Sequence, residues 1–247
     1  MTQTYLLLHG GAGPQSVAAF AARLAAEPGA RVLAPTHPGF DGTERPAHID
    51  SVRALAAHYR DYLDELGVRD VTVIGNSIGG WVAAELALLG SPRVARIVLV
   101  DAVGVEVPGH PVADFFNLTP AQIAAASYYE PQQFAVDPAR MAGNRAALAV
   151  YAGEPSMVDP TLLARLQGVP NPALVVWGDS DGIADSDYGR AFAEAIPGAR
   201  FVVLEKTGHL PQIENPQGLL DVVRGWVADA PKAAHPLTSH LTPEESF

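Results

Sequence analysis

One serine lies in a setting that suits a nucleophile. Ser77 stands in Gly75-Asn-Ser-Ile-Gly79, between the apolar run 71–74 and the Ala/Leu-rich stretch 81–89. The first run is typical of a buried strand and the second of a helix. A strand that turns straight into a helix exposes its apex residue at the helix N-terminus, where N–H groups favour negative charge. The pattern predicts Ser77 as a nucleophile; the alternative is a tight turn with a capping serine.

A serine nucleophile needs a base, an acid that orients the base, and donors for an oxyanion. In a parallel sheet such groups meet where the strands end. The candidates that follow predicted strands are His9, His37, Asp101, Asp179, Asp181 and His209. The chain order Ser77, Asp181, His209 favours Asp181 as the acid, because it comes one strand before His209. Asp101 and Asp179 remain alternatives.

The elements that must position these residues alternate along the chain. Short apolar runs predict six strands at 4–8, 31–34, 71–74, 96–100, 173–177 and 200–204. Helices are predicted at 17–26, 50–66, 81–89, 186–195 and 216–228, the second capped by Asp50 and the third carrying Trp81 toward the core. This rhythm predicts an α/β fold, with a mostly parallel six-stranded sheet covered by helices on both faces.

Two stretches depart from that rhythm. Residues 105–170 hold no convincing strand and a large share of the aromatic residues, and Thr119-Pro-Ala-Gln122 is a capping box that starts a helix. We interpret them as a small helical insertion. Residues 231–247 are polar and punctuated by proline, which predicts a loosely held tail after a domain at 1–230.

Composition narrows the possible partners. The 247 residues are 48% hydrophobic and 17% charged, with a net charge of −11 and no cysteine. The negative charge argues against nucleic acid and anionic membrane surfaces as partners, and the missing cysteines exclude disulfides and thiolate metal sites. No apolar run approaches the ~18 residues of a membrane span, and no signal peptide is visible. A cytoplasmic location is therefore expected, and the oligomeric state is left open.

Four stretches together resemble the α/β-hydrolase-fold serine hydrolases. They are His9-Gly-Gly-Ala-Gly13, Gly75-Asn-Ser-Ile-Gly-Gly80, Trp177-Gly-Asp-Ser-Asp181 and Gly208-His-Leu-Pro-Gln-Ile-Glu-Asn-Pro216. They span nearly the whole chain in the order of that family. The resemblance implies Ser77 as nucleophile, His209 as base and Asp181 as the orienting acid. It also implies an oxyanion hole formed by the backbone N–H groups of Gly11 and Ile78, with the insertion as a cap over the site.

Other residues could shape the substrate site. His37, Phe115, Phe116 and Tyr128 are candidate substrate contacts, although His37 could instead stabilise its loop and the aromatic residues could form the core of the cap. No metal or cofactor is expected. The Gly11-x-Gly13 loop has Ser16 where a dinucleotide loop has its third glycine, and the aspartates of 179–187 lack the turn glycine of a calcium loop.

The predicted function is hydrolysis of a carboxylic ester, or a related acyl bond, in a small apolar substrate. The Gly75-Asn-Ser-Ile-Gly-Gly80 stretch also resembles C–C hydrolases of aromatic degradation, so a C–C hydrolase or a lactonase is the alternative enzyme. Those C–C hydrolases tend to carry tryptophan where Leu210 follows His209. A receptor or lyase that keeps the triad is a third possibility, because the same fold hosts such proteins.

Overall fold

A single parallel sheet organises the chain. The computed structural model describes residues 2–134, 138–153 and 157–229. Its six strands run in the order β2-β1-β3-β4-β5-β6, and every neighbouring pair is parallel. The strands are β1 Gln3–Leu8, β2 Ala30–Leu33, β3 Val71–Asn76, β4 Val94–Val100, β5 Ala173–Gly178 and β6 Arg200–Leu204. The predicted number of strands and their parallel direction are confirmed.

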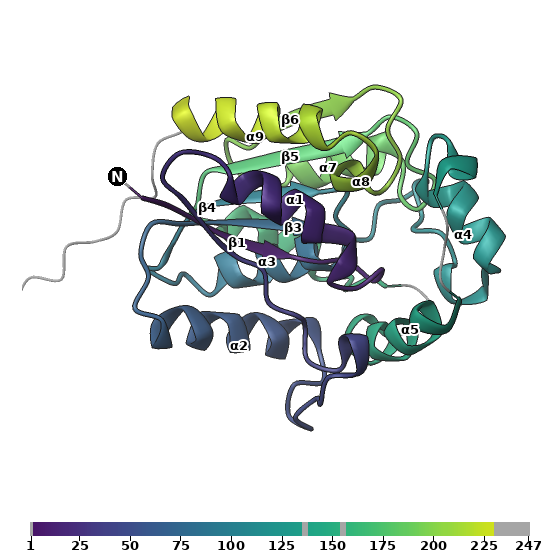
Figure 1. Cartoon of the computed structure of the whole chain (residues 1–247), viewed down its shortest axis with the longest axis horizontal. Helices are drawn as coiled ribbons and strands as arrows, with labels where there is room; N and C mark the ends of the chain where they lie inside the picture. The colour runs from purple at the N-terminus through teal and green to yellow at the C-terminus, as the bar shows by residue number, and fades with distance from the viewer. Residues whose placement is uncertain (1, 135–137, 154–156, 230–247) are drawn as a thin grey trace, which may run out of the picture.

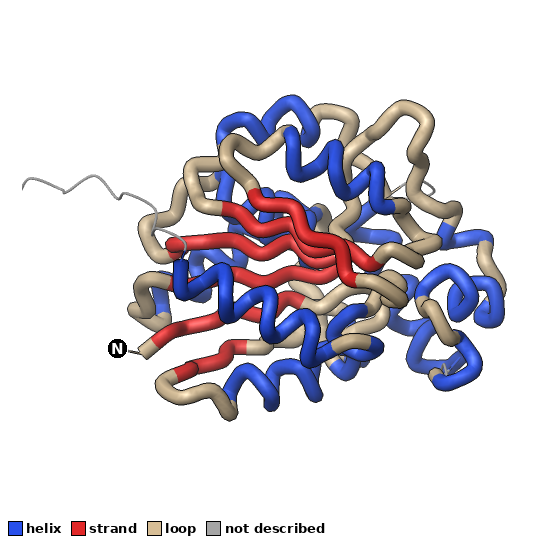
Figure 2. The backbone as a smooth tube through the Cα atoms, turned by 90° about the horizontal axis from the view of Figure 1, so that it is seen from above, coloured by secondary structure: helices blue, strands red, loops and turns tan. Residues whose placement is uncertain are grey.

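Helices cover both faces of the sheet (Figures 1 and 2). They are α1 Gln15–Ala25, α2 Val52–Glu65, α3 Ile78–Leu88, α7 Ser186–Glu194, α8 Pro211–Glu214 and α9 Pro216–Asp229. Side chains of α1 and α9 pack with Tyr5 and Leu7 of β1, whereas side chains of α2, α3 and α7 pack with Leu6 and Leu8. Successive residues of a strand point to opposite faces, so β1 contributes to both cores.

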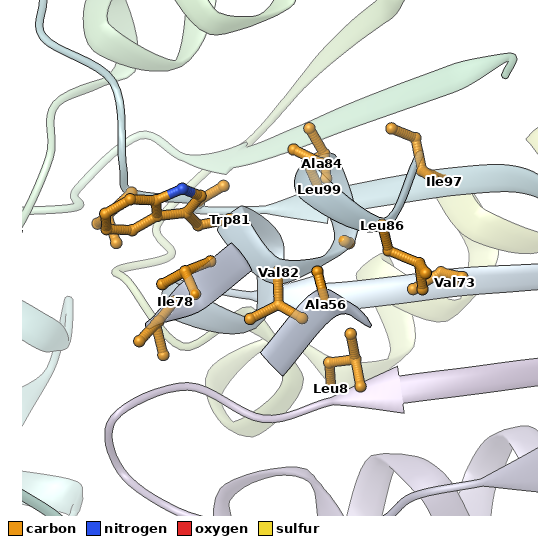
Figure 3. Close-up of a cluster of buried hydrophobic side chains, with 14 of the residues drawn as sticks. Leu8, Ala56, Val73, Ile78, Trp81, Val82, Ala84, Leu86, Ile97 and Leu99 are labelled. Atoms are coloured by element: carbon orange, nitrogen blue, oxygen red, sulfur yellow. The ribbon is translucent and has the colours of Figure 1, made fainter. Parts of the chain in front are cut away.

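The helix that follows Ser77 is buried on all sides. The described side chains of α3 from Ile78 to Ala87 are all buried, and Figure 3 shows several of them packed among Leu8, Ala56 and Val73. Trp81 lies in this core, as expected, and its ring covers Gly104, where a Cβ would come within 2.5 Å of the indole. A helix that is buried all round has no solvent face, which fixes the position of its N-terminus.

The described residues between β4 and β5 contain no strand longer than a single bridge. They form η2 Phe115–Asn117, α4 Pro120–Ser127, η3 Pro131–Gln133, α5 Pro138–Ala152, α6 Leu162–Arg165 and η4 Leu166–Gly168. The capping box between Thr119 and Gln122 is confirmed. Helices α4 and α5 lie beyond the carboxyl ends of the strands (Figure 1). The role of 105–170 as a cap stays a prediction, and the predicted tail at 231–247 lies outside the described residues.

Some boundaries differ from the predicted ones. The cap of α2 is Ser51, whose side chain accepts the N–H of Ala54 at 3.2 Å, and not Asp50. Helix α3 begins directly after Ser77, three residues earlier than the Ala/Leu pattern indicates. Glycine has a low helix propensity, so Gly79 and Gly80 do not look helical in the sequence although they belong to the helix. No helix in the described ranges has both the length and the apolar character needed to cross a membrane.

Candidate active site

Ser77 lies at a strained turn between β3 and α3. Its φ is 56° and its ψ is −122°, a conformation that non-glycine residues rarely adopt. Its N–H donates to the carbonyl oxygen of Val100 at 3.0 Å, and its own carbonyl oxygen accepts the N–H of Gly80 at 2.9 Å. The turn also depends on glycine: a Cβ on Gly75 would lie 2.1 Å from the carbonyl oxygen of Gly79. Strain held in this way is characteristic of functional residues.

His209 and Asp181 are brought together by the loops that follow the last two strands. Nδ1 of His209 and Oδ2 of Asp181 are 2.7 Å apart, and both side chains are buried. The carboxylate also accepts the N–H groups of Ile183 at 2.7 Å and Ala184 at 3.2 Å. Because a carboxylate accepts hydrogen bonds, Nδ1 carries the proton and Nε2 is left with a lone pair. An imidazole in this tautomer can act as a general base.

Ser77 and His209 line the same cavity, which has a volume of about 270 Å³. The described residues include no hydrogen bond between the Ser77 hydroxyl and the His209 ring, a contact that is often longer before substrate binds. The walls are mostly apolar, and they include Phe115, Ile123, Tyr128, Met141, Leu148, Met157 and Ile183. Five of these come from the helices and loops between residues 105 and 152, so the insertion forms much of the wall.

Comparison with known proteins identifies the family of this chain. The sequence model of the Alpha/beta hydrolase family matches residues 5–222. The chain belongs to this family. It is 30% identical to a pimeloyl-[acyl-carrier protein] methyl ester esterase of Aromatoleum aromaticum, over 89% of this chain and 98% of that one. It is 29% identical to a 2-hydroxymuconate semialdehyde hydrolase of Pseudomonas putida, over 81% and 78%.

Solved structures agree on the fold of this α/β hydrolase. A meta-cleavage product hydrolase from Pseudomonas fluorescens IP01 superposes with a TM-score of 0.77 at 21% identity, covering 92% of this chain and 90% of that one. An esterase from Exiguobacterium antarcticum superposes with a TM-score of 0.74 at 20% identity, covering 92% of each chain. At this level of identity the two structures support the shared fold, which both hydrolase types adopt.

The two residues predicted to form the oxyanion hole are Gly11, on the same cavity wall as Ser77, and Ile78, which follows Ser77 in the chain. Gly11 lines the cavity, and Ile78 is the first residue of α3. The first N–H groups of a helix have no acceptor within the helix, so the Ile78 N–H is available to an oxyanion. Space beside Gly11 is limited, since a Cβ there would lie 2.9 Å from Cδ2 of Leu148. Their role as oxyanion donors stays a prediction.

His37 does not line the described cavity wall, and its contacts fit the alternative expectation that it stabilises its loop. Its Nε2–H donates to the carbonyl oxygen of His9 at 2.9 Å, and its Nδ1 accepts the hydroxyl of Tyr59 at 2.5 Å. His37 is fully buried, so both ring nitrogens are used within the fold. Its N–H in turn donates to Nε2 of His9, which therefore carries its proton on Nδ1 and donates it to Gly10.

Both histidines of this network are neutral. Burial lowers the pKa of His9 to about 4. Burial, followed by the nearby His9 ring, lowers the pKa of His37 well below its usual value. The two rings lie 3.8 Å apart between centroids, which is a close packing for neutral imidazoles. The network joins the loop after β1 to helix α2, which gives His9 a structural role in holding that loop.

The other predicted substrate contacts divide into two groups. Phe115 and Tyr128 line the cavity. Phe116 is half-buried and packs edge-on against Phe115 at a centroid distance of 5.9 Å, outside the described cavity wall.

The structure adds Arg145 to the wall, a residue that the sequence did not single out as a contact. Its guanidinium lies 5.8 Å from the Phe115 ring centroid and donates to the carbonyl oxygen of Leu118 at 3.3 Å.

The alternative acids occupy different places. Asp179 is bonded to the Ser180 hydroxyl at 2.7 Å and to the N–H of Thr207 at 3.2 Å, so it closes its own turn. Asp101 is fully buried beside Asp181 and His209; one atom from each of the three residues lies within 4.8 Å of the others. Two carboxyl groups and an imidazole are also ligands that a divalent cation could use.

Three polar side chains that sequence reasoning missed hold the loop of His209. Nδ2 of Asn76 donates to the carbonyl oxygens of His209 at 3.0 Å and Val100 at 3.2 Å. Its Oδ1 accepts Nε2 of Gln212 at 3.1 Å. Glu214 accepts the N–H groups of Gly208 at 2.6 Å and Tyr129 at 2.8 Å. Asn76 adjoins the nucleophile in the Gly75–Gly79 motif, and that adjacency is the signal that could have identified it.

Proposed function

We propose that this α/β hydrolase cleaves a carboxylic ester of a small, uncharged, apolar substrate through Ser77, His209 and Asp181. The observation that carries the proposal is the strained Ser77 on the wall of a cavity that also contains the oriented imidazole of His209. The similarity to a methyl ester esterase supports the same bond type. The mostly apolar wall favours an uncharged acyl group, since a desolvated charge needs a partner.

In this mechanism Nε2 of His209 takes the proton of the Ser77 hydroxyl while Oγ attacks the ester carbonyl carbon. The N–H groups of Gly11 and Ile78 bind the oxyanion that forms. His209 then gives the proton to the departing alkoxide, which leaves as an alcohol and gives the acyl-enzyme. Water, deprotonated by the same nitrogen, attacks the acyl carbon; the bond from that carbon to Oγ of Ser77 then breaks, the acid leaves, and the imidazolium returns its proton to Oγ. Asp181 stabilises the imidazolium that forms in each half-reaction.

A graded panel of aryl esters tests the proposal. Wild type should turn over short acyl chains steadily and react with a fluorophosphonate, whereas Ser77→Ala should lose at least ~10³-fold in rate and all labelling. Ser127→Ala removes another serine hydroxyl from the same cavity wall, so it is the matched labelling control and should still react. Near-native turnover by folded Ser77→Ala would refute the mechanism. Binding with at most one turnover would point to a receptor.

A C–C hydrolase is the second candidate. It is favoured by the similarity to 2-hydroxymuconate semialdehyde hydrolase and by the cation of Arg145 on the cavity wall. The two candidates differ in the charge of the substrate, because a semialdehyde of a dienoic acid carries a carboxylate that Arg145 could pair with. Measuring turnover of 2-hydroxymuconate semialdehyde beside the ester panel separates them, since the preferred bond has the higher kcat/KM.

A further inference from the structure

A second buried carboxyl group lies beside the His209–Asp181 pair. Asp101 directly follows β4 and Asp181 follows β5, and because these strands pair in parallel register their loops leave the sheet side by side. Asp101 is fully buried, and its φ of 45° turns the chain sharply after Val100. Two ionised carboxylates this close in a water-poor site repel each other strongly, so a proton or a cation must lie between them.

The hydrogen-bond donors around the pair are distributed unequally. Asp181 accepts three N–H groups, from His209, Ile183 and Ala184. Asp101 accepts one, from the backbone of Gly178 at 2.8 Å to Oδ1. Its Oδ2 is buried and receives no donor from the described residues. A carboxylate with three donors is stabilised as the anion, whereas an oxygen without a donor is suited to hold the proton.

We propose that Asp101 is a neutral carboxylic acid that donates the proton on Oδ2 to the Asp181 carboxylate and thereby positions Asp181 against His209. The proposal rests on the proposed role of Asp181 and His209. The pair then carries a single negative charge, which lies on the oxygen atoms nearest the imidazole. Asp101 touches neither substrate nor nucleophile, and so it acts as a positioning residue through Asp181.

The surroundings of Asp101 favour its protonated, neutral form. Burial raises the pKa of Asp101 well above its usual value, and the charge of Asp181 adds to the effect. The hydrogen bond from the Gly178 N–H lowers the pKa of Asp101, whereas a hydrogen bond with Asp181 and the charge of Glu214 on α8 raise it. His209 faces the same cluster from the loop after β6. The proton is retained because removing it would leave two adjacent buried charges.

Infrared difference spectroscopy tests the protonation state without any assay of activity. The spectrum of wild type minus Asp101→Asn at pH 7 should contain the C=O stretching band of a protonated carboxylic acid. Asp179→Asn, a change in the exposed part of the neighbouring loop, is the matched control and should give a difference spectrum without that band. Absence of the band in the Asp101 difference spectrum would overturn the proposal. Because the measurement is spectroscopic, it tests the protonation of Asp101 independently of whether the protein hydrolyses esters.

Kinetics test the positioning role. Asp101→Asn keeps an N–H donor of the same size and should retain kcat within about 3-fold at pH 7, whereas Asp101→Leu keeps the shape without the donor and should lose about 10-fold or more in kcat with little change in KM. The wild-type pH profile should fall at alkaline pH where Asp101 ionises, and that limb should be missing in Asp101→Asn. Equal losses in the Asn and Leu variants would show that an ionised Asp101 is required and would overturn the proposal.

A cation between the carboxyl groups would give a different result. In that case EDTA should inactivate wild type and an added divalent cation should restore it. Under the proposal, wild type keeps its full rate in EDTA and binds no stoichiometric metal by elemental analysis. Loss of activity in EDTA with recovery by the metal would replace the proton by a metal ion and refute the proposed pair.

Discussion

The side-chain amide of Asn76 donates to the carbonyl oxygen of His209 at 3.0 Å, so the residue before Ser77 holds the backbone of His209. The same amide nitrogen also reaches Val100 at the end of β4. One side chain therefore connects the end of β3, the end of β4 and the loop after β6. This connection sets the separation between the Ser77 turn and the His209 imidazole without using the side chain of either residue.

Asn76→Leu should slow catalysis more than its loss of stability suggests. The change removes both donations from Nδ2 and leaves the buried carbonyl oxygen of His209 without its donor, which costs about 1–3 kcal/mol of unfolding free energy, whereas the carbonyl oxygen of Val100 keeps the N–H of Ser77. Because the His209 loop loses its link to the Ser77 turn, kcat should fall about 10-fold or more while KM changes little. Chemical denaturation and ester kinetics measure the two effects.

Gln212→Leu is the matched control. Nε2 of Gln212 donates to Oδ1 of Asn76, and within the described residues the Gln212 side chain makes no hydrogen bond to His209. Gln212→Leu should lower the free energy of unfolding by about the cost of one lost hydrogen bond and should change kcat only a few-fold. If both variants slow kcat equally, the link from Asn76 to His209 is not what sets the geometry.

Asp181→Asn should reduce kcat by up to ~10⁴-fold with little change in fold. An amide can donate to Nδ1 and stabilise the wrong imidazole tautomer, so His209 loses its function as a base. Asp179→Asn changes the same loop two residues away, where the carboxylate closes a turn, and should cost far less. The reverse order of the two variants would assign the acid to Asp179.

The sheet and the acid–base pair could be predicted because they depend on local patterns. Six apolar runs define the strands, and His209 and Asp181 directly follow two of them. The adjacency of Asp101 and Asp181 depends on β4 lying next to β5, which the order of residues does not reveal. For that reason the sequence presented the two aspartates as alternatives, whereas the structure places them in one cluster.

The cavity wall and the role of His37 were harder to predict. Arg145 lies on a helix of the insertion without a motif or a distinctive spacing, and its place on the wall follows from how α5 packs. His37 follows a strand as His209 does, yet its ring turns inward because Tyr59 and the carbonyl oxygen of His9 supply both partners. Position at a strand end therefore identifies candidates, and the partner atoms decide between them.

Stability should fall with decreasing pH because of the buried histidines. The folded pKa of His9 is about 4 and that of His37 is also lowered, both by burial, whereas an unfolded histidine has a pKa near 6.5. Between these values the unfolded state binds more protons than the folded state, so the free energy of unfolding rises with pH and is lost as pH falls from ~6.5 toward ~4. Thermal unfolding at pH 7.5 and pH 5 measures the loss.

His37→Gln tests the source of that pH dependence. Glutamine can keep the donor to the carbonyl oxygen of His9 and does not titrate, so the variant is less stable at pH 7.5 but loses less additional stability at pH 5. His48→Gln changes an exposed histidine and should keep the wild-type slope. An unchanged slope in His37→Gln would assign the pH dependence to other groups.

The charge of Arg145 should matter little for uncharged esters. Its guanidinium already contacts the Phe115 and Phe116 rings and donates to Leu118, so it does not need a substrate carboxylate to be stabilised. Wild type should prefer uncharged apolar esters over esters with a free carboxylate, and Arg145→Met should keep kcat/KM for the uncharged ones within about 3-fold. A graded panel of the two ester types measures the preference.

The control for that prediction is Arg190→Met. Arg190 lies 5.1 Å from the Phe201 ring centroid, a similar cation–aromatic contact that belongs to α7 and β6 and lies outside the described cavity wall. It should leave both ester types unaffected. If wild type instead prefers carboxylate-bearing substrates and Arg145→Met removes that preference by about 10-fold or more, the size of a lost charge-assisted hydrogen bond, the cation recognises the substrate. That result would favour the C–C hydrolase over the ester hydrolase.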